Sequence, residues 1–97
     1  MKRFPDSLLE AAYINMAYAS AQQSGYDAAR EVLEESLELM PTSVYLRHAL
    51  ARLHLWKKQA GLADALYLEM AEMPIADTGL ISEIKSYWKL RRLLRKK

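Results

Sequence analysis

The sequence predicts an all-α protein of five helices, arranged as stacked antiparallel hairpins. Glycine and proline are scarce, with three of each in 97 residues, so most of the chain lies in long segments without turn signals. Within these segments apolar residues recur at steps of three and four, which is the spacing of one helical face. The turn signals fall at residues 24–25, 41–43, 60–61 and 74–79 and therefore separate five helices.

The first helix is predicted from about Asp6 to Gln23. Asp6 or Ser7 caps its first turn, because both side chains accept hydrogen bonds from free backbone amides. Its broad apolar face consists of Leu8, Leu9, Ala12, Tyr13, Met16, Ala17 and Ala19.

The second helix lies between Ser24-Gly25 and Pro41. Gly25 breaks the preceding helix, since glycine reaches left-handed backbone angles easily, and Asp27 is expected to cap the next one. Pro41 ends the helix because it has no amide hydrogen to donate. The face predicted to be buried holds Ala29, Leu33, Ser36 and Met40, with Leu37 beside them. The opposite face is acidic and holds Glu31, Glu34, Glu35 and Glu38.

The remaining three helices follow the same spacing. The third starts after Thr42-Ser43 and continues to about Gln59, and its apolar residues are Leu46, Ala49, Leu50 and Leu53. The fourth covers about Leu62 to Met73, with a predicted core stripe of Leu62, Ala65, Leu66, Met70 and Met73. Asp77 or Thr78 caps the fifth, which runs towards the C-terminus.

Charge is distributed unevenly along the chain. Residues 80–97 hold seven basic residues against Glu83 alone, a net charge of +6, so the formal total of +2 leaves −4 for residues 1–79. There is no cysteine, no apolar run of about 18 residues that would span a membrane, and no apolar N-terminal run typical of a secretion signal. A cytoplasmic protein is the expectation, although the cytosolic fragment of a larger or membrane-associated protein would have the same composition.

Residues 24–41 resemble the second helix of a tetratricopeptide repeat. They combine a small-residue corner, an aromatic after it, alanine at the helix entrance and proline just past the end. Shifting the chain by the family's period of 34 residues places Ala29 on Ala63 and Leu33 on Tyr67. The family's first-helix pattern has an aromatic residue, then Leu-Gly three and four residues on, then an aromatic after three more. Its four positions are occupied here by Tyr13, Met16, Ala17 and Ser20, of which three are acceptable; by Arg47, Leu50, Ala51 and His54, a weaker match; and by Ile81, Ile84, Lys85 and Trp88.

The resemblance implies a single domain, residues 1–97, forming a short right-handed superhelix. Its parts would be a first repeat at about 10–43, a second at about 44–77 and a capping helix at about 78–97 with a basic end. Lys85 replaces the small residue of the pattern, as a last helix with no partner on that side would tolerate. A pair of antiparallel helical hairpins of some other family is the alternative fold.

Through that resemblance, the expected function is protein–protein interaction without catalysis. The domain would be a scaffold, adaptor or chaperone-like protein that binds a peptide or helix in a concave groove, and a homodimer is also compatible with its size. Small tetratricopeptide-like chaperones of bacterial secretion systems are similar in length. The family's groove positions correspond here to Ile14, Asn15, Tyr18, Gln22, Tyr45, His48, Arg52 and Trp56. A clamp for a C-terminal carboxylate is not expected, because Ile14 and Tyr18 replace the Lys and Asn that accompany Asn15 in such clamps.

The basic end supports an alternative function. A basic amphipathic helix attaches to anionic membrane surfaces or to nucleic acid phosphates, whereas the same cations can simply favour the helix C-terminus and solubility. The residues are Lys85, Lys89, Arg91, Arg92, Arg95, Lys96 and Lys97. No nucleophile with its base, phosphate loop or metal-ligand spacing occurs, and His48 and His54 lie on different sides of a helix. We therefore expect no enzymatic activity, metal, cofactor or small-molecule substrate.

Overall fold

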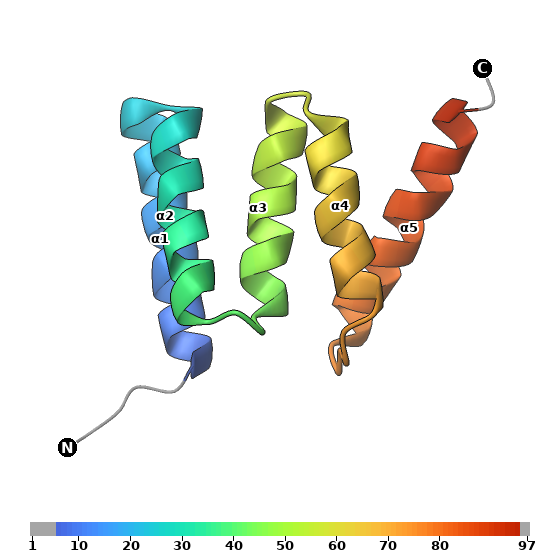
Figure 1. The fold of residues 1–97 in the computed structure, drawn as a ribbon, viewed down its shortest axis with the longest axis horizontal. Helices are drawn as coiled ribbons and strands as arrows, with labels where there is room; N and C mark the ends of the chain where they lie inside the picture. The colour runs from blue at the N-terminus through green and yellow to red at the C-terminus, as the bar shows by residue number, and fades with distance from the viewer. Residues whose placement is uncertain (1–5, 96–97) are drawn as a thin grey trace.

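The computed structural model describes residues 6–95, and the side chains of residues 8–94. This part of the chain forms five α-helices and no strand: α1 (Asp6–Ser24), α2 (Tyr26–Leu39), α3 (Val44–Trp56), α4 (Ala60–Ala71) and α5 (Thr78–Arg95). Successive helices run in opposite directions; α1 lies behind α2 at one end of the molecule, and α3, α4 and α5 follow in order towards the other end (Figure 1). The prediction of an all-α fold with stacked helical hairpins is confirmed.

The first turn forms where the sequence predicted it, but by a different cap. Gly25 has a φ of +92° and precedes α2 without any side-chain cap, which is a left-handed conformation that glycine adopts most easily. Its amide donates to the carbonyls of Ser20 and Ala21, at 3.1 Å each. Asp27 was expected to cap α2 and does not. It lies inside the first helical turn, where its charge favours the helix dipole.

The turn between α3 and α4 lies earlier than predicted. α3 ends at Trp56, not Gln59, and α4 begins at Ala60, not Leu62, so Gly61 lies within the helix. The chain reverses through Lys58, whose φ is +63°, and the Gln59 amide closes the turn on the His54 carbonyl at 2.8 Å. Sequence reasoning placed the turn at glycine, because a lysine in a left-handed conformation carries no such signal.

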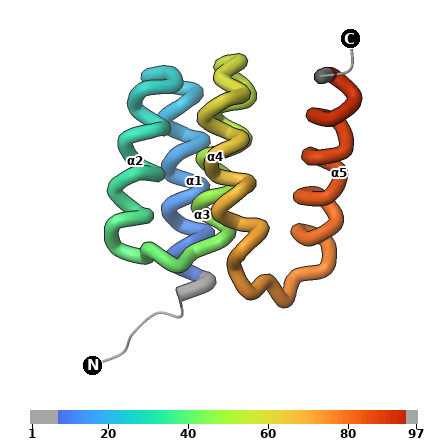
Figure 2. Tube along the Cα trace, turned by 45° about the vertical axis from the view of Figure 1, so that its right-hand side comes forward, coloured from blue at the N-terminus to red at the C-terminus, as the bar shows by residue number. Residues whose placement is uncertain are grey.

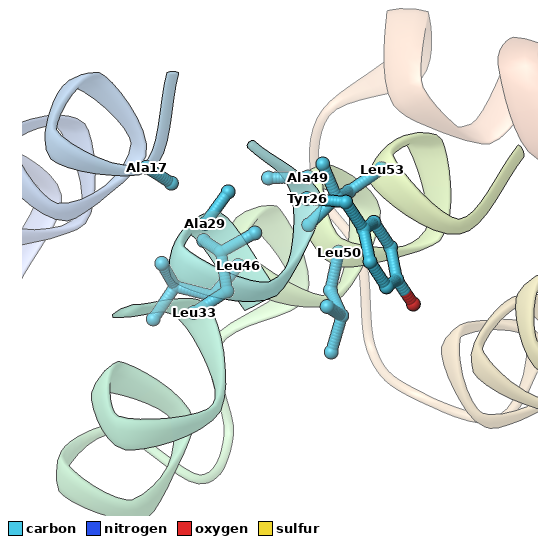
Figure 3. Close-up of a cluster of buried hydrophobic side chains, with 8 residues drawn as sticks. All are labelled: Ala17, Tyr26, Ala29, Leu33, Leu46, Ala49, Leu50 and Leu53. Carbon is cyan, nitrogen blue, oxygen red and sulfur yellow. The ribbon is translucent and has the colours of Figure 1, made fainter. Parts of the chain in front are cut away.

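The first hydrophobic cluster joins α1, α2 and α3. Its buried members are Ala17, Tyr26, Ala29, Leu33, Leu46, Ala49, Leu50 and Leu53 (Figure 3). Small residues on α1, α2 and α3 let the helices approach closely while leucines fill the space between them. In the last turn of α3, Nδ1 of the buried His54 lies 2.8 Å from the Tyr26 hydroxyl oxygen, and that hydroxyl donates to Gln59 Oε1 at 2.7 Å.

The second cluster joins α3, α4 and α5. Its buried members are Ala51, Ala63, Tyr67, Met70, Leu80, Ile84 and Tyr87. The stripe predicted for α4 is therefore wrong in its register: Met70 is buried, but Leu62 is 48% exposed and Ala65 is exposed. Leu66 and Met73 are half-buried, and Leu66 packs against both clusters.

The predicted apolar face of α1 is only partly used. Ala17 is buried and Tyr13 is half-buried. Leu8, Leu9, Ala12, Met16 and Ala19 are exposed, with Met16 at 53%. The reason is position: α1 lies with α2 at one end of the molecule (Figure 1), and within the described structure it packs only against α2 and α3, so its remaining sides are uncovered.

A few specific contacts hold α5 against its neighbours. The rings of Tyr67 and Tyr87 stack with centroids 3.8 Å apart. Arg91 donates to both carboxylate oxygens of Asp64, at 2.9 and 2.8 Å, and the Tyr87 hydroxyl donates to the same carboxylate. Away from these contacts α5 leans away from α4 towards its C-terminal end (Figures 1 and 2).

Candidate partner-binding groove

Two helices that do not form a hairpin, α1 and α3, enclose an open groove. Tyr18, Ala21 and Gln22 come from α1, and Arg52, Leu53 and Trp56 come from α3; together they surround about 400 Å³. The buried Leu53 and the small, half-buried Ala21 leave room between the larger side chains. Tyr18, Gln22, Arg52 and Trp56, four of the eight residues expected to bind a partner, thus surround one hollow.

The aromatic residues of this groove are unusually open to solvent. Tyr18 is 47% exposed and Trp56 is 63% exposed, and Arg52 and Gln22 are exposed as well. Large aromatic side chains that lie open beside a guanidinium are typical of binding surfaces rather than of packing. The groove can therefore offer apolar area, an amide and one charge-assisted hydrogen-bond donor.

A second hollow lies one turn or more further along the same two helices. Glu10, Ala11, Ile14 and Tyr45 surround about 290 Å³. The Tyr45 hydroxyl donates to Asp77 Oδ2 at 2.8 Å, and this bond raises the pKa of Tyr45 and lowers that of Asp77. Asn15 is exposed but lines neither hollow.

His48 is placed differently from the other expected groove residues. Its Nε2 lies 2.8 Å from Glu83 of α5, and its ring meets Tyr67 edge-on at 6.2 Å. Burial lowers the pKa of His48, and the Glu83 carboxylate opposes that shift. His48 therefore links α3 to α5 and lines neither hollow.

The basic residues at the C-terminal end do not all share one environment. Arg91 is paired with Asp64, whereas Lys89 is exposed. Lys85 and Arg92 line a cleft beside α5 that sequence reasoning did not predict. Lys96, Lys97 and the side chain of Arg95 lie outside the residues that the structure describes.

The described residues contain no group of three or more His, Asp or Glu side chains arranged to hold a metal ion. His54 is buried on Tyr26, and its pKa is lowered by burial and then by the charge of Arg30. Between residues 6 and 95 there is also no helix with both the length and the apolar character needed to cross a lipid bilayer.

Comparison with known proteins found no matching family model, no matching curated protein and no matching solved structure.

Proposed function

We propose that this protein is a non-catalytic, tetratricopeptide-like interaction module of the cytoplasm. It binds a peptide or helix of another protein in the groove between α1 and α3. The observation that supports this most directly is that residues of both helices, Tyr18, Gln22, Arg52 and Trp56, line one and the same open hollow.

The chemistry of the groove defines the kind of segment it would take. Tyr18 and Trp56 would bury apolar side chains of the partner at little entropic cost, because each ring has few rotatable bonds. Arg52 would hold a carboxylate with two parallel hydrogen bonds. The partner segment should therefore carry at least one bulky apolar residue and an Asp or Glu side chain nearby.

A capture experiment tests the proposal with a matched control. The groove variant is Tyr18→Ala with Arg52→Glu, and the control is Leu68→Ala with Lys89→Glu, which removes an exposed apolar side chain and reverses a cation outside the groove. Each protein, with its fold checked by circular dichroism, captures partners from native lysate, and chemical cross-links are mapped by mass spectrometry. We expect a partner that cross-links beside α1 and α3, that the control retains and that the groove variant loses. Equal capture by the folded groove variant would rule the groove out.

The basic residues of α5 support a second candidate, binding to phosphate-rich surfaces. At about 100° per residue, Lys85, Lys89 and Arg92 lie within roughly 60° of one another, and all three are exposed. Such a row would bind nucleic acid or an anionic membrane surface, with an affinity that falls steeply as salt rises. Binding of the wild-type protein to duplex RNA or to phosphatidylserine vesicles at about 50 and 200 mM salt measures this. A complex unaffected by salt would contradict it.

A further inference from the structure

A cleft of about 510 Å³ lies between α4 and α5. Met70 and Met73 contribute one wall. Ile81, Ile84 and Trp88 contribute the other, together with Lys85 and Arg92, which are the two charged residues of the lining. From Ile81 to Arg92 the wall extends about three helical turns, or roughly 16 Å.

The residues of the α5 wall correspond to positions that are covered elsewhere in the same chain. A shift of 34 residues relates Ile84, Lys85 and Trp88 to Leu50, Ala51 and His54 of α3, all three of which are buried. On α3, Leu50 belongs to the first hydrophobic cluster, with residues of α1 and α2, and Ala51 shares the second cluster with Ala63 of α4.

The first hairpin repeats this arrangement. Ala17 of α1 and Ala29 of α2 are both buried in the first cluster, and Ala17 precedes Ala51 by 34 residues. Each of α1 and α3 is thus followed by an antiparallel helix over its small residue (Figure 1). The described residues bring no helix to the corresponding side of α5, where Lys85 stands in place of alanine.

We propose that this cleft takes an acidic amphipathic helix of a partner protein. The helix would lie antiparallel to α5, as α2 lies on α1 and α4 lies on α3. Its apolar stripe would enter between Met70, Met73 and Trp88, and carboxylates two turns apart would meet Lys85 and Arg92, which are seven residues apart on one side of α5. This site is separate from the α1–α3 groove, and its assignment does not rest on the function proposed for that groove.

Charge argues against a second copy of this chain as the occupant. Two α5 helices packed together would bring the Lys85 and Arg92 side chains of both copies into the same cleft, and like charges there oppose association. The protein's own acidic face, on α2, has a single large exposed apolar residue, Leu39, which is too little to fill the cleft.

The cleft offers little apolar area to a lipid surface. A helix that lies on a membrane needs its apolar residues facing the lipid and its cations beside them. The apolar residues beside Lys85 and Arg92 are Ile84, which is buried, and Ile81 and Trp88, which are half-buried. The exposed Leu90 and Leu94 lie roughly 160–180° round α5 from Arg92 and Lys85, respectively, at about 100° per residue, and they do not line the cleft.

The chain provides both a reporter and a probe for this site. Trp56 and Trp88 are its only tryptophans, Trp56 in the α1–α3 groove and Trp88 in the α4–α5 cleft, so Trp56→Phe leaves Trp88 as the sole tryptophan and Trp88→Phe leaves Trp56. The probe is a synthetic peptide of residues 24–41, the acidic helix that packs against α1, with blocked ends. A matched peptide has Glu31, Glu34, Glu35 and Glu38 replaced by Lys, which reverses its charge and keeps its apolar stripe.

We expect saturable binding of the acidic peptide, with a blue shift of Trp88 emission and no response from Trp56. Lys85→Glu should weaken this binding about tenfold, because a like charge then faces the peptide in the cleft. Lys89→Glu, one turn away on the same helix and outside the lining, should weaken it less than about threefold. The charge-reversed peptide should bind at least tenfold more weakly to the wild-type cleft and regain affinity for the Lys85→Glu variant.

Four results would overturn the proposal. The first is equal binding of the two peptides, and the second is equal weakening of peptide binding by Lys85→Glu and Lys89→Glu. The third is no binding of the acidic peptide at about 50 mM salt, where charge attraction is strong. The fourth is a blue shift of Trp88 emission that phosphatidylserine vesicles produce and the acidic peptide does not. Sedimentation of the protein alone adds a fifth: a dimer that Lys85→Glu strengthens would assign the cleft to a second copy.

Discussion

Replacing Tyr26 by Phe should destabilise the protein because it leaves a buried hydrogen-bond donor without an acceptor, and not because packing is lost. The Tyr26 ring is buried, with 8% exposure, and Phe keeps it. The hydroxyl carries one hydrogen, which goes to Gln59 Oε1 at 2.7 Å, so at the 2.8 Å contact His54 Nδ1 is the donor. In Tyr26→Phe that N–H, on a side chain only 5% exposed, loses its acceptor.

The expected loss is about 1–3 kcal/mol, the usual penalty for a buried polar group left without its partner. In a chain of this length each kcal/mol lowers Tm by about 4–8 °C. Urea unfolding followed by far-ultraviolet circular dichroism measures the difference in unfolding free energy. Tyr18→Phe is the control, since Tyr18 is half exposed and lies in the open groove, and it should stay within about 0.5 kcal/mol of wild type.

A double variant distinguishes the cost of an unsatisfied buried hydrogen-bond donor from the cost of lost side-chain packing. Tyr26→Phe with His54→Leu removes both polar partners, and replacing both by apolar groups should restore most of the stability, to within about 1 kcal/mol of wild type. His54→Leu alone should lose less than Tyr26→Phe alone, because the Tyr26 hydroxyl keeps Gln59. The reasoning fails if Tyr26→Phe is as stable as wild type, or if the two single losses simply add in the double variant.

Three further predictions concern the core and the two histidines. Leu33 is only 2% exposed, so Leu33→Ala should lower the unfolding free energy by about 2–5 kcal/mol. Leu39 is 68% exposed, so Leu39→Ala should change the unfolding free energy by less than about 0.5 kcal/mol. Equal urea midpoints for the two variants would contradict the assignment of the core. Burial lowers the pKa of His54 and of His48 in the folded state, so near the ordinary histidine pKa of about 6.5 the unfolded chain binds more protons than the folded protein. The unfolding free energy should therefore be at its full value above that pH and fall as the pH drops through it. His54→Leu should show a smaller fall, and an unchanged dependence of the unfolding free energy on pH would refute this. Glu83→Gln removes the carboxylate that opposes the effect of burial, so the pKa of His48, followed by NMR titration, should fall further. An unchanged pKa would show that Glu83 does not act on His48.

The parts of the fold that could be predicted are those decided locally. The Gly25 turn and the end of α2 before Pro41 follow from the backbone chemistry of those two residues. The 34-residue shift also placed Ala63 and Tyr67 on buried positions of the preceding hairpin, and both are buried. The simple apolar stripe of α4 failed because that helix is apolar on more than one side, and stacking of Tyr67 on Tyr87, a tertiary contact, decides which side is covered.

The candidate sites divide in the same way. Repeat register alone grouped eight residues, and four of them, Tyr18, Gln22, Arg52 and Trp56, surround one hollow. Neither the pairing of His48 with Glu83 nor that of Arg91 with Asp64 could be foreseen, because each joins residues far apart in sequence whose meeting depends on how α5 docks. Only one feature of the sequence indicated the α4–α5 cleft, namely Lys85 at a position where the repeat pattern has a small residue.

The position of α3 between the two hydrophobic clusters has a consequence for how binding events would communicate. Ala49, Leu50 and Leu53 belong to one cluster, whereas Ala51 belongs to the other, so α3 is the shared wall, with Leu66 as the bridging side chain. In a linear array of helices, free energy passes only between neighbours. A segment bound between α1 and α3 and a helix bound beside α5 would therefore influence each other's affinity through the rigidity of α3, and a change in its packing would alter their cooperativity without touching either site.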